Sequence, residues 1–202
     1  MKLKKWEIAL FVSVLIAVIW GVNTQNQQKQ LAEKLIRFHV VADSDDEEDQ
    51  RIKLEVRDAV LNEVDVLLEN VNDRDNAEVI LSKNLDAIIK AAKKELKAQG
   101  DNNNVSVTLV EESFPTRYYD TFTLPAGNYT SLRVTIGEGK GHNWWCVVFP
   151  PICATAAIED AEIASFTESE LELITDDNTE TVIKFKTLEM FTKIREWFAV
   201  SE

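Results

Sequence analysis

A short basic start followed by a long apolar run divides this chain into a leader and a domain. Lys2, Lys4 and Lys5 precede "IALFVSVLIAVIWGV", which extends from Ile8 to Val22. A basic segment followed by an apolar segment is typical of a secretory signal, whereas a permanent bilayer span usually needs about 20 apolar residues. We therefore predict that the protein is exported and that residues 1–22 are a signal peptide or an N-terminal membrane anchor.

The remainder of the chain is predicted to form one folded domain. Residues 23–34 are polar and are the candidate linker, and residues 35–202 form the domain. The chain has 202 residues, of which 45% are hydrophobic and 28% charged, so it is long enough to bury a substantial core. Its formal net charge of -13 argues against nucleic acid as a partner, because phosphate binding requires a basic face.

The first part of the domain has the pattern of a strand followed by a helix. Residues 35–42, "LIRFHVVA", alternate as a strand does. Ser44 and Glu47 then have the spacing of a capping box, and the acids of "DSDDEEDQ" suit the first turn of a helix. A calcium-binding loop is excluded, because Glu48 stands where that loop needs glycine and Leu54 where it needs its closing glutamate.

The spacing of apolar residues predicts the other elements. Residues 72–100 read as one helix, capped by Asp75 or Asn76 and ended by Gly100. Extended runs follow at 105–112, 117–124, 129–136 and 142–149, and residues 182–200 read as a closing helix. We therefore expect an α+β fold, in which helices cover one face of a mainly antiparallel sheet.

Residues 137–153, "GEGKGHNWWCVVFPPIC", have the most unusual composition in the chain. Gly137 and Gly139 are separated by one residue and Lys140 is followed by Gly141, so the segment matches neither a P-loop nor a dinucleotide-binding fingerprint. The glycines instead predict a tight turn, where side chains would obstruct a close approach. The spacing of the two histidines and two cysteines is not that of a zinc site, and we predict neither a metal nor a cofactor.

Both cysteines lie in this segment and admit three interpretations. In an exported protein Cys146 and Cys153 could form a disulfide across the bend made by Pro150 and Pro151, or both could be buried thiols. Alternatively, Cys146 could be the nucleophile of a hydrolase, with His142 or His39 as its base. On a strand, however, His142 and Cys146 would be roughly 13 Å apart, too far for direct proton transfer.

A recognition role is the remaining interpretation of the segment. Trp144 and Trp145 are residue types from which binding hot spots are built, and on a strand they point to opposite faces. One tryptophan can then pack in the core while the other is available to a partner, or both can be buried. A cell-wall-binding module that uses exposed aromatic residues is one protein class with these features.

Three segments resemble the stage II sporulation protein R family of endospore-forming bacteria. They are "LIRFHVVADSDDEEDQRIKLEVRDAVL" (35–61), "FPTRYYDTFTLPAGNYTSLRVTIGEGKGHNWWCVVFPPIC" (114–153) and "KFKTLEMFTKIREWF" (184–198). The resemblance implies a signalling protein that is not an enzyme, made in the forespore and exported into the space between the two membranes. Its implied partner is the membrane-embedded aspartic protease named stage II sporulation protein GA, which processes the precursor of mother-cell sigma factor E.

The resemblance does not indicate which residues contact the protease, so the contact set is a hypothesis from residue chemistry. The density of glycine, aromatic and acidic residues favours two segments, the strand and turn at 37–45 and the start of 137–153. The candidate contact residues are Arg37, His39, Asp43, Ser44, Asp45, Gly137, Gly139, Lys140, Gly141, His142, Asn143, Trp144 and Trp145.

Overall fold

The structure is a computed structural model that describes residues 4–119 and 122–151. These residues divide into two compact units, which are considered separately. The first unit contains helix α1 (Lys5–Ala32) and the segment Phe114–Gly127, in which the short strands β3 (Arg117–Tyr118) and β4 (Thr123–Leu124) form an antiparallel pair. The predicted linker residues 23–32 are therefore helical, as the last part of α1.

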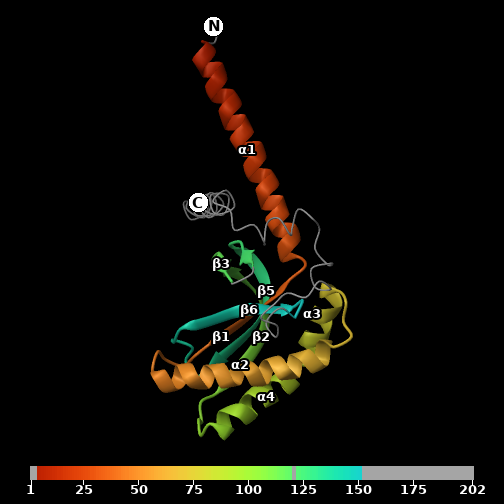
Figure 1. Ribbon diagram of the computed structural model, residues 1–202, viewed down its shortest axis with the longest axis vertical. Coiled ribbons are helices and arrows are strands. Elements are labelled where there is room, and N and C mark those ends of the chain that lie inside the picture. The colour runs from red at the N-terminus through yellow and green to blue at the C-terminus, as the bar shows by residue number, and fades with distance from the viewer. Residues whose placement is uncertain (1–3, 120–121, 152–202) are drawn as a thin grey trace, which may run out of the picture. The chain divides into compact units, whose positions relative to one another are not determined.

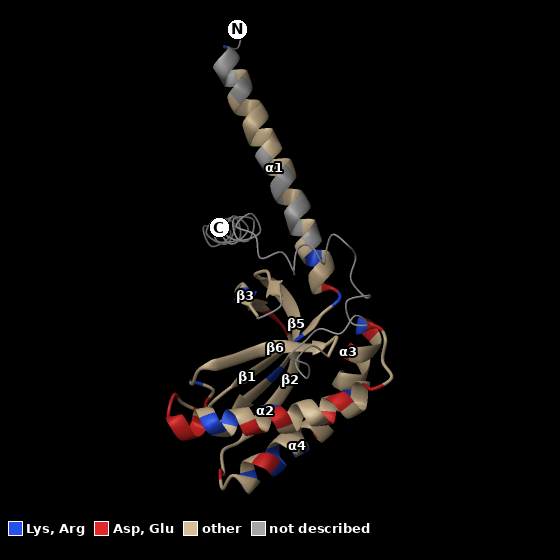
Figure 2. Ribbon diagram, viewed as in Figure 1, with Lys and Arg blue, Asp and Glu red and all other residues tan. Residues whose placement is uncertain are grey.

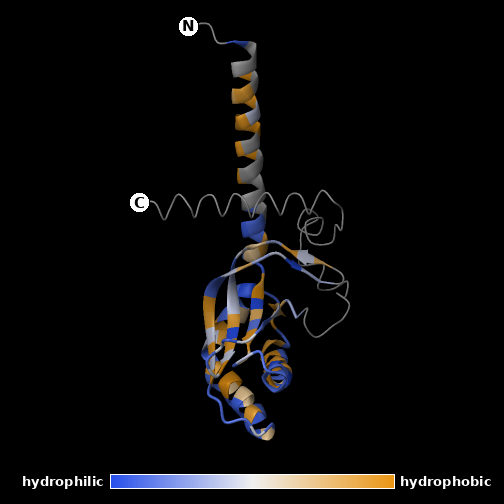
Figure 3. Ribbon diagram, turned by 90° about the vertical axis from the view of Figure 1, so that its left-hand side faces the viewer, coloured by the Kyte–Doolittle hydropathy of each residue, from blue (hydrophilic) through white to orange (hydrophobic). Residues whose placement is uncertain are grey.

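Helix α1 carries most of the apolar leader. The side chains described along it include Leu10, Phe11, Leu15, Ile16 and Ile19, each more than half exposed, and Figure 3 shows the hydrophobic colouring along this helix. Within the part of the chain that the structure describes, no helix has both the length and the apolar character needed to cross a membrane.

The second unit is a four-stranded sheet with three helices. Its strands are β1 (Ile36–Val41), β2 (Val105–Phe114), β5 (Gly127–Ile136) and β6 (Asn143–Phe149), in the order β2-β5-β1-β6. Strand β1 pairs antiparallel with β6 and parallel with β5. The helices are α2 (Glu47–Leu68), α3 (Arg74–Lys83) and α4 (Leu85–Ala98), and they lie on one side of the sheet (Figure 1). The predicted α+β class, with helices beside a mainly antiparallel sheet, is confirmed.

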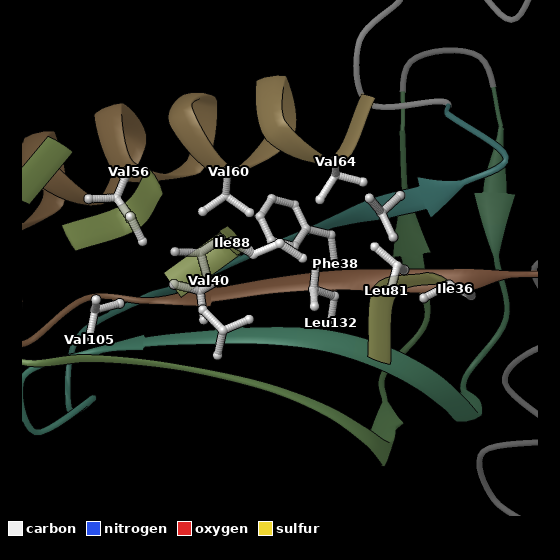
Figure 4. Packing of buried hydrophobic residues seen from close by; sticks show 14 of the residues in the cluster. Ile36, Phe38, Val40, Val56, Val60, Val64, Leu81, Ile88, Val105 and Leu132 are labelled. Carbon is white, nitrogen blue, oxygen red and sulfur yellow. The ribbon is translucent and has the colours of Figure 1, made fainter. Parts of the chain in front are cut away.

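The core lies between the sheet and these helices. Alternate residues of β1, namely Ile36, Phe38 and Val40, face it, and the α2 residues Val56, Val60 and Val64 pack on them from above (Figure 4). The spacing of four along α2 places its apolar residues on one side, while charged residues occupy the remainder (Figure 2). Burial of these side chains is the main force that fixes the helices to the sheet.

Helix boundaries differ from the predicted ones where polar side chains bind the backbone. The predicted helix 72–100 is wrong as a single element, because Asn84 leaves the helical conformation and its side chain donates to the Ile80 carbonyl at 2.8 Å. Asp73, not Asp75 or Asn76, caps α3 by accepting from the Asn76 amide at 2.8 Å. Gly100 ends α4 as predicted, with a φ of 78°.

Two further local predictions are corrected. Ser44 is not the N-cap of α2: that position is Asp46, and Ser44 Oγ accepts from the Asp46 amide at 3.1 Å. The predicted strand 117–124 is the β3–β4 pair, a hairpin and not one extended run. The predicted closing helix 182–200 lies outside the described residues.

Candidate functional site

Two loops that are distant in sequence meet at one end of the sheet. Residues 42–46 follow β1 and residues 137–142 connect β5 to β6; we call them the paired loops. Their backbones are joined directly, because Gly141 donates to the Ala42 carbonyl and Lys140 to the Asp43 carbonyl, both at 3.0 Å. The pairing follows from the sheet order, since β1 lies between β5 and β6. The two segments chosen from residue chemistry therefore form one continuous structure.

Two aspartates bind amides of the opposite loop. The Asp43 carboxylate accepts from the Glu138 amide at 2.5 Å, and the Asp45 carboxylate accepts from the His142 amide at 2.6 Å. Asp43 also accepts from the side chain of Asn103 at 3.3 Å. Hydrogen bonds to an ionised acceptor are stronger than neutral ones. In the sequence these acids suggested the start of a helix. In the structure they also bind the backbone of the loop at residues 137–142.

The glycines permit the loops to approach this closely. Gly137 and Gly139 have φ values of 55° and 64°, which side-chain-bearing residues rarely adopt. A Cβ atom on Gly137 would lie 2.1 Å from Asp43 Oδ1, and one on Gly141 would lie 2.1 Å from the Ser44 carbonyl oxygen. The predicted reason for the glycine cluster, a turn crowded by a neighbouring segment, is confirmed.

A buried lysine of α2 supports the paired loops from beneath. Lys53 is only 5% exposed, and its ammonium donates to the His142 carbonyl at 3.1 Å and to Gln50 Oε1 at 2.6 Å. Gln50 in turn donates to the Ser44 carbonyl at 2.8 Å. Burial lowers the pKa of Lys53, an effect that the nearby charge of Asp45 partly offsets. One lysine–glutamine pair therefore attaches both loops to α2, and sequence reasoning missed both residues.

The outer surface of the paired loops presents polar and charged side chains. The side chains of Lys140 and His142 are 75% and 76% exposed. His142 Nδ1 lies 2.5 Å from Asp45 Oδ1, and Lys140 forms an ion pair with Glu138. Exposed pairs such as these contribute little to stability. Their side chains are therefore available for contacts with a partner.

Arg37 and His39 are placed differently, on the sheet face opposite the helices. Arg37 is fully buried; its Nε donates to the Cys146 carbonyl at 3.1 Å and its guanidinium lies over the Tyr129 ring. His39 is 7% exposed and contacts Glu112 Oε1 at 3.1 Å and Asn143 Oδ1 at 2.8 Å. Both were candidate contact residues, and the structure instead gives them positions inside the fold.

Glu112 of β2 is the acidic centre of this face and was not identified from the sequence. Burial acts to raise its pKa, but hydrogen bonds from His39 and Ser131 and the charges of His39 and Arg133 outweigh that effect, so the pKa of Glu112 is lowered. Arg133 lies 3.4 Å from it. The signal available in the sequence was that Glu112 is an acidic residue within a segment that otherwise has the pattern of a strand.

The two tryptophans lie on opposite faces of β6, as predicted. Trp144 meets Phe38 edge-on at a centroid distance of 5.8 Å, and Arg57 of α2 lies over its ring. Trp145 stacks on His39 at 5.6 Å. Both indoles are partly buried. Trp144 therefore contacts the helix-covered face of the sheet, and Trp145 contacts the opposite face.

The cysteine and metal interpretations can be compared with these positions. Cys146 is buried in β6 and is disulfide-bonded, a state that has no thiolate to act as a nucleophile. The other member of the predicted pair, Cys153, lies outside the described residues, so the pairing with Cys153 stays a prediction. Among the residues that are described, no group of three or more His, Cys, Asp or Glu side chains could hold a metal ion.

The fold and the site define a small α+β domain that presents rigid, charged loops. The model of the stage II sporulation protein R family matches residues 32–159. The chain is also 32% identical over 169 residues to stage II sporulation protein R of Bacillus subtilis (strain 168), covering 81% of this chain and 75% of that protein. The chain belongs to the stage II sporulation protein R family, and its role is in sporulation. No solved structure matches it.

Proposed function

We propose that the chain is an exported signalling protein of endospore formation and not an enzyme. In this proposal it activates the membrane-embedded aspartic protease, stage II sporulation protein GA, which processes the precursor of mother-cell sigma factor E. Membership of the stage II sporulation protein R family supports the sporulation part. The basic and apolar leader supports export from the forespore into the space between the membranes.

The paired loops are the observation that carries the binding part of the proposal. Their backbones are fixed by hydrogen bonds to each other and to Lys53, while Lys140 and His142 extend into solvent. A surface that is rigid before binding loses little conformational entropy when a partner docks. Such a surface activates the protease if it binds the active arrangement more tightly than the inactive one.

The apolar leader adds a membrane contact to the proposal. Exposed apolar side chains along α1, such as Leu15 and Ile19, suit contact with lipid. If α1 is retained, it keeps the domain at the membrane and raises its effective concentration near the protease. A leader-free domain supplied outside the membrane should then need a much higher concentration for the same activation. Equal potency of the two forms would contradict the anchoring role.

Reconstitution in a heterologous cell tests the proposed function. The cell would express the protease and the sigma factor precursor, with or without this chain, and precursor cleavage would be followed on immunoblots. Cleavage should require the chain. The double variant Lys140→Ala/His142→Ala should lower cleavage at least tenfold, because it removes two exposed side chains whose own ion pairs contribute little to stability. Lys93→Ala/Lys94→Ala, two exposed lysines of α4, is the matched control.

Two results would contradict this proposal in different ways. Cleavage that proceeds equally well without the chain would exclude activation of this protease. Full cleavage with the Lys140→Ala/His142→Ala variant, at normal protein level, would leave the activation intact and remove the paired loops as its contact surface.

A further inference from the structure

Strand β2 forms one edge of the four-stranded sheet. It pairs with β5 on one side, and no other described strand lies beyond it. In Figure 4, β5 lies between β1 and β2. Strand β2 has 10 residues, Val105–Phe114, and is longer than the five or six residues usual for a strand. An edge strand presents a row of backbone N–H and C=O groups that another extended segment can pair with.

The composition of β2 lacks most of the features that protect an edge strand, and its one inward-pointing charge is Glu112, which contacts His39. Proteins commonly block edge strands with lysine, proline, a bulge or a very short strand. The sequence from Val105 to Ser113, "VSVTLVEES", contains no lysine, arginine, proline or glycine. Its residues are mostly β-branched or small, which suits pairing in a sheet.

The side chains of β2 differ in burial along the strand. Val105 and Val107 are buried in the core beneath the helices, and Leu109 packs against it. Ser106, Thr108 and Glu111 are exposed, and Val110 is 38% exposed. The core contacts and the pairing of Glu112 with His39 therefore hold the strand in an extended form, while Ser106, Thr108 and Glu111 stay exposed. Such a strand is already shaped for addition of a further strand.

We propose that β2 takes up an extended segment of a partner protein by strand addition, and that this segment carries lysine or arginine. The charged residues of β2 are both acids: Glu112 is paired with His39 and Arg133, and Glu111 is exposed to a partner. Cross-strand pairs of opposite charge stabilise a sheet, and like charges opposite each other destabilise it. The charge of this edge therefore favours a basic partner segment.

The same charges disfavour a second copy of this chain as the occupant. Two copies joined through β2 would bring together two acidic edges and two chains with a formal charge of -13 each. A basic segment instead neutralises Glu111 while its backbone continues the sheet. The identity of the partner as the protease rests on the proposed function, whereas the strand addition rests on β2 itself.

Photo-crosslinking from β2 tests the inference. The photoreactive residue p-benzoylphenylalanine would replace Thr108 in the full-length chain, expressed in the reconstituted system and in sporulating cells. Position 66 of α2, where Val66 is 73% exposed, is the control site. We expect light-dependent adducts from position 108 alone, with the attachment site mapped by mass spectrometry to an extended, lysine- or arginine-containing segment of another protein.

Mutation of the edge supplies an independent readout. Thr108→Lys/Val110→Lys places two cations on the edge and should reduce the partner's binding and precursor cleavage at least tenfold. Val66→Lys, a matched change on a helix surface, should change neither. Circular dichroism and thermal melting would establish that both variants are folded.

Each result decides between the edge inference and the proposed function. Cleavage that needs the chain but is unaffected by Thr108→Lys/Val110→Lys, with no adduct from position 108, overturns strand addition and leaves the proposed function in place. Adducts to a second copy, or to residues 152–202 of the same chain, also overturn it. An adduct to a basic segment of a different protein, abolished by Val110→Lys, supports strand addition while excluding the protease as the partner.

Discussion

Different forces hold two regions next to the same sheet. One is the apolar layer between the sheet and its helices, and the other is the paired loops at one end of the sheet. Phe38, Val56 and Val60 of the apolar layer are fully buried, and burial of nonpolar surface holds them together. The paired loops are held by backbone amides, two carboxylates and a buried ammonium, with exposed side chains above. Stability and the proposed recognition would then belong to separate parts of one domain, so mutations should separate them.

The largest expected effect comes from the apolar layer. Phe38 is fully buried between the sheet and α2, so Phe38→Ala should lower the free energy of unfolding by about 3–5 kcal/mol, through lost burial and a cavity. Urea unfolding followed by circular dichroism would measure the loss. Val66→Ala, at an exposed position of α2, is the control and should change stability little. A loss below about 1 kcal/mol for Phe38→Ala would contradict the packing described.

A smaller effect is expected where the paired loops touch. Gly141→Ala places a methyl group against the Ser44 backbone, so the loops must separate at a cost of about 1–3 kcal/mol. Amide hydrogen exchange should quicken at Lys140 and Gly141 while the core amides stay protected. Gly100→Ala is the comparison: there the new methyl group meets open space, and only the positive φ costs about 1 kcal/mol. Unchanged exchange in Gly141→Ala would show that the loops tolerate separation.

The smallest effect on stability is expected for Lys53→Met, because lost hydrogen bonds and relieved desolvation oppose each other. At neutral pH we expect a change within about 1 kcal/mol, together with faster exchange at the paired loops. Since burial lowers the pKa of Lys53, the charged form costs stability at neutral pH. This cost disappears as the pH rises through the lowered pKa toward the ordinary value. The wild type should therefore gain stability over Lys53→Met in alkaline solution, and a constant difference would contradict the assigned pKa shift.

Local patterns in the sequence predicted most of the elements but not their exact ends. The alternation of residues 35–42 and 105–112 predicted strands close to the observed β1 and β2, and the acids of "DSDDEEDQ" predicted the first turn of α2. The break at Asn84 and the cap at Asp73 were missed, because each depends on a single hydrogen bond between one side chain and one backbone group. Several residues nearby in the sequence could have made the same bond.

The candidate site was predictable in composition but not in assembly. The glycines of 137–141 and the acids of 43–45 were each unusual in composition. No local pattern, however, predicted that Asp45 binds the His142 amide, which is 97 residues away. That contact depends on β1 entering between β5 and β6. Arg37 and His39 were assigned to the same surface because they lie in the segment 37–45, which was chosen for its unusual composition. The alternation of a strand places them on the face opposite the core, where they are buried.

The central position of β1 in the sheet determines when the paired loops can form during synthesis and folding. Its neighbours β5 and β6 are made long after it, because all three helices and β2 come between β1 and β5 in the chain. A newly made or unfolded chain consequently has neither half of the loop surface in working form, since each loop is shaped by the other. Under the proposed function, a chain that crosses the membrane unfolded would therefore present no formed loop surface until it folds on the far side.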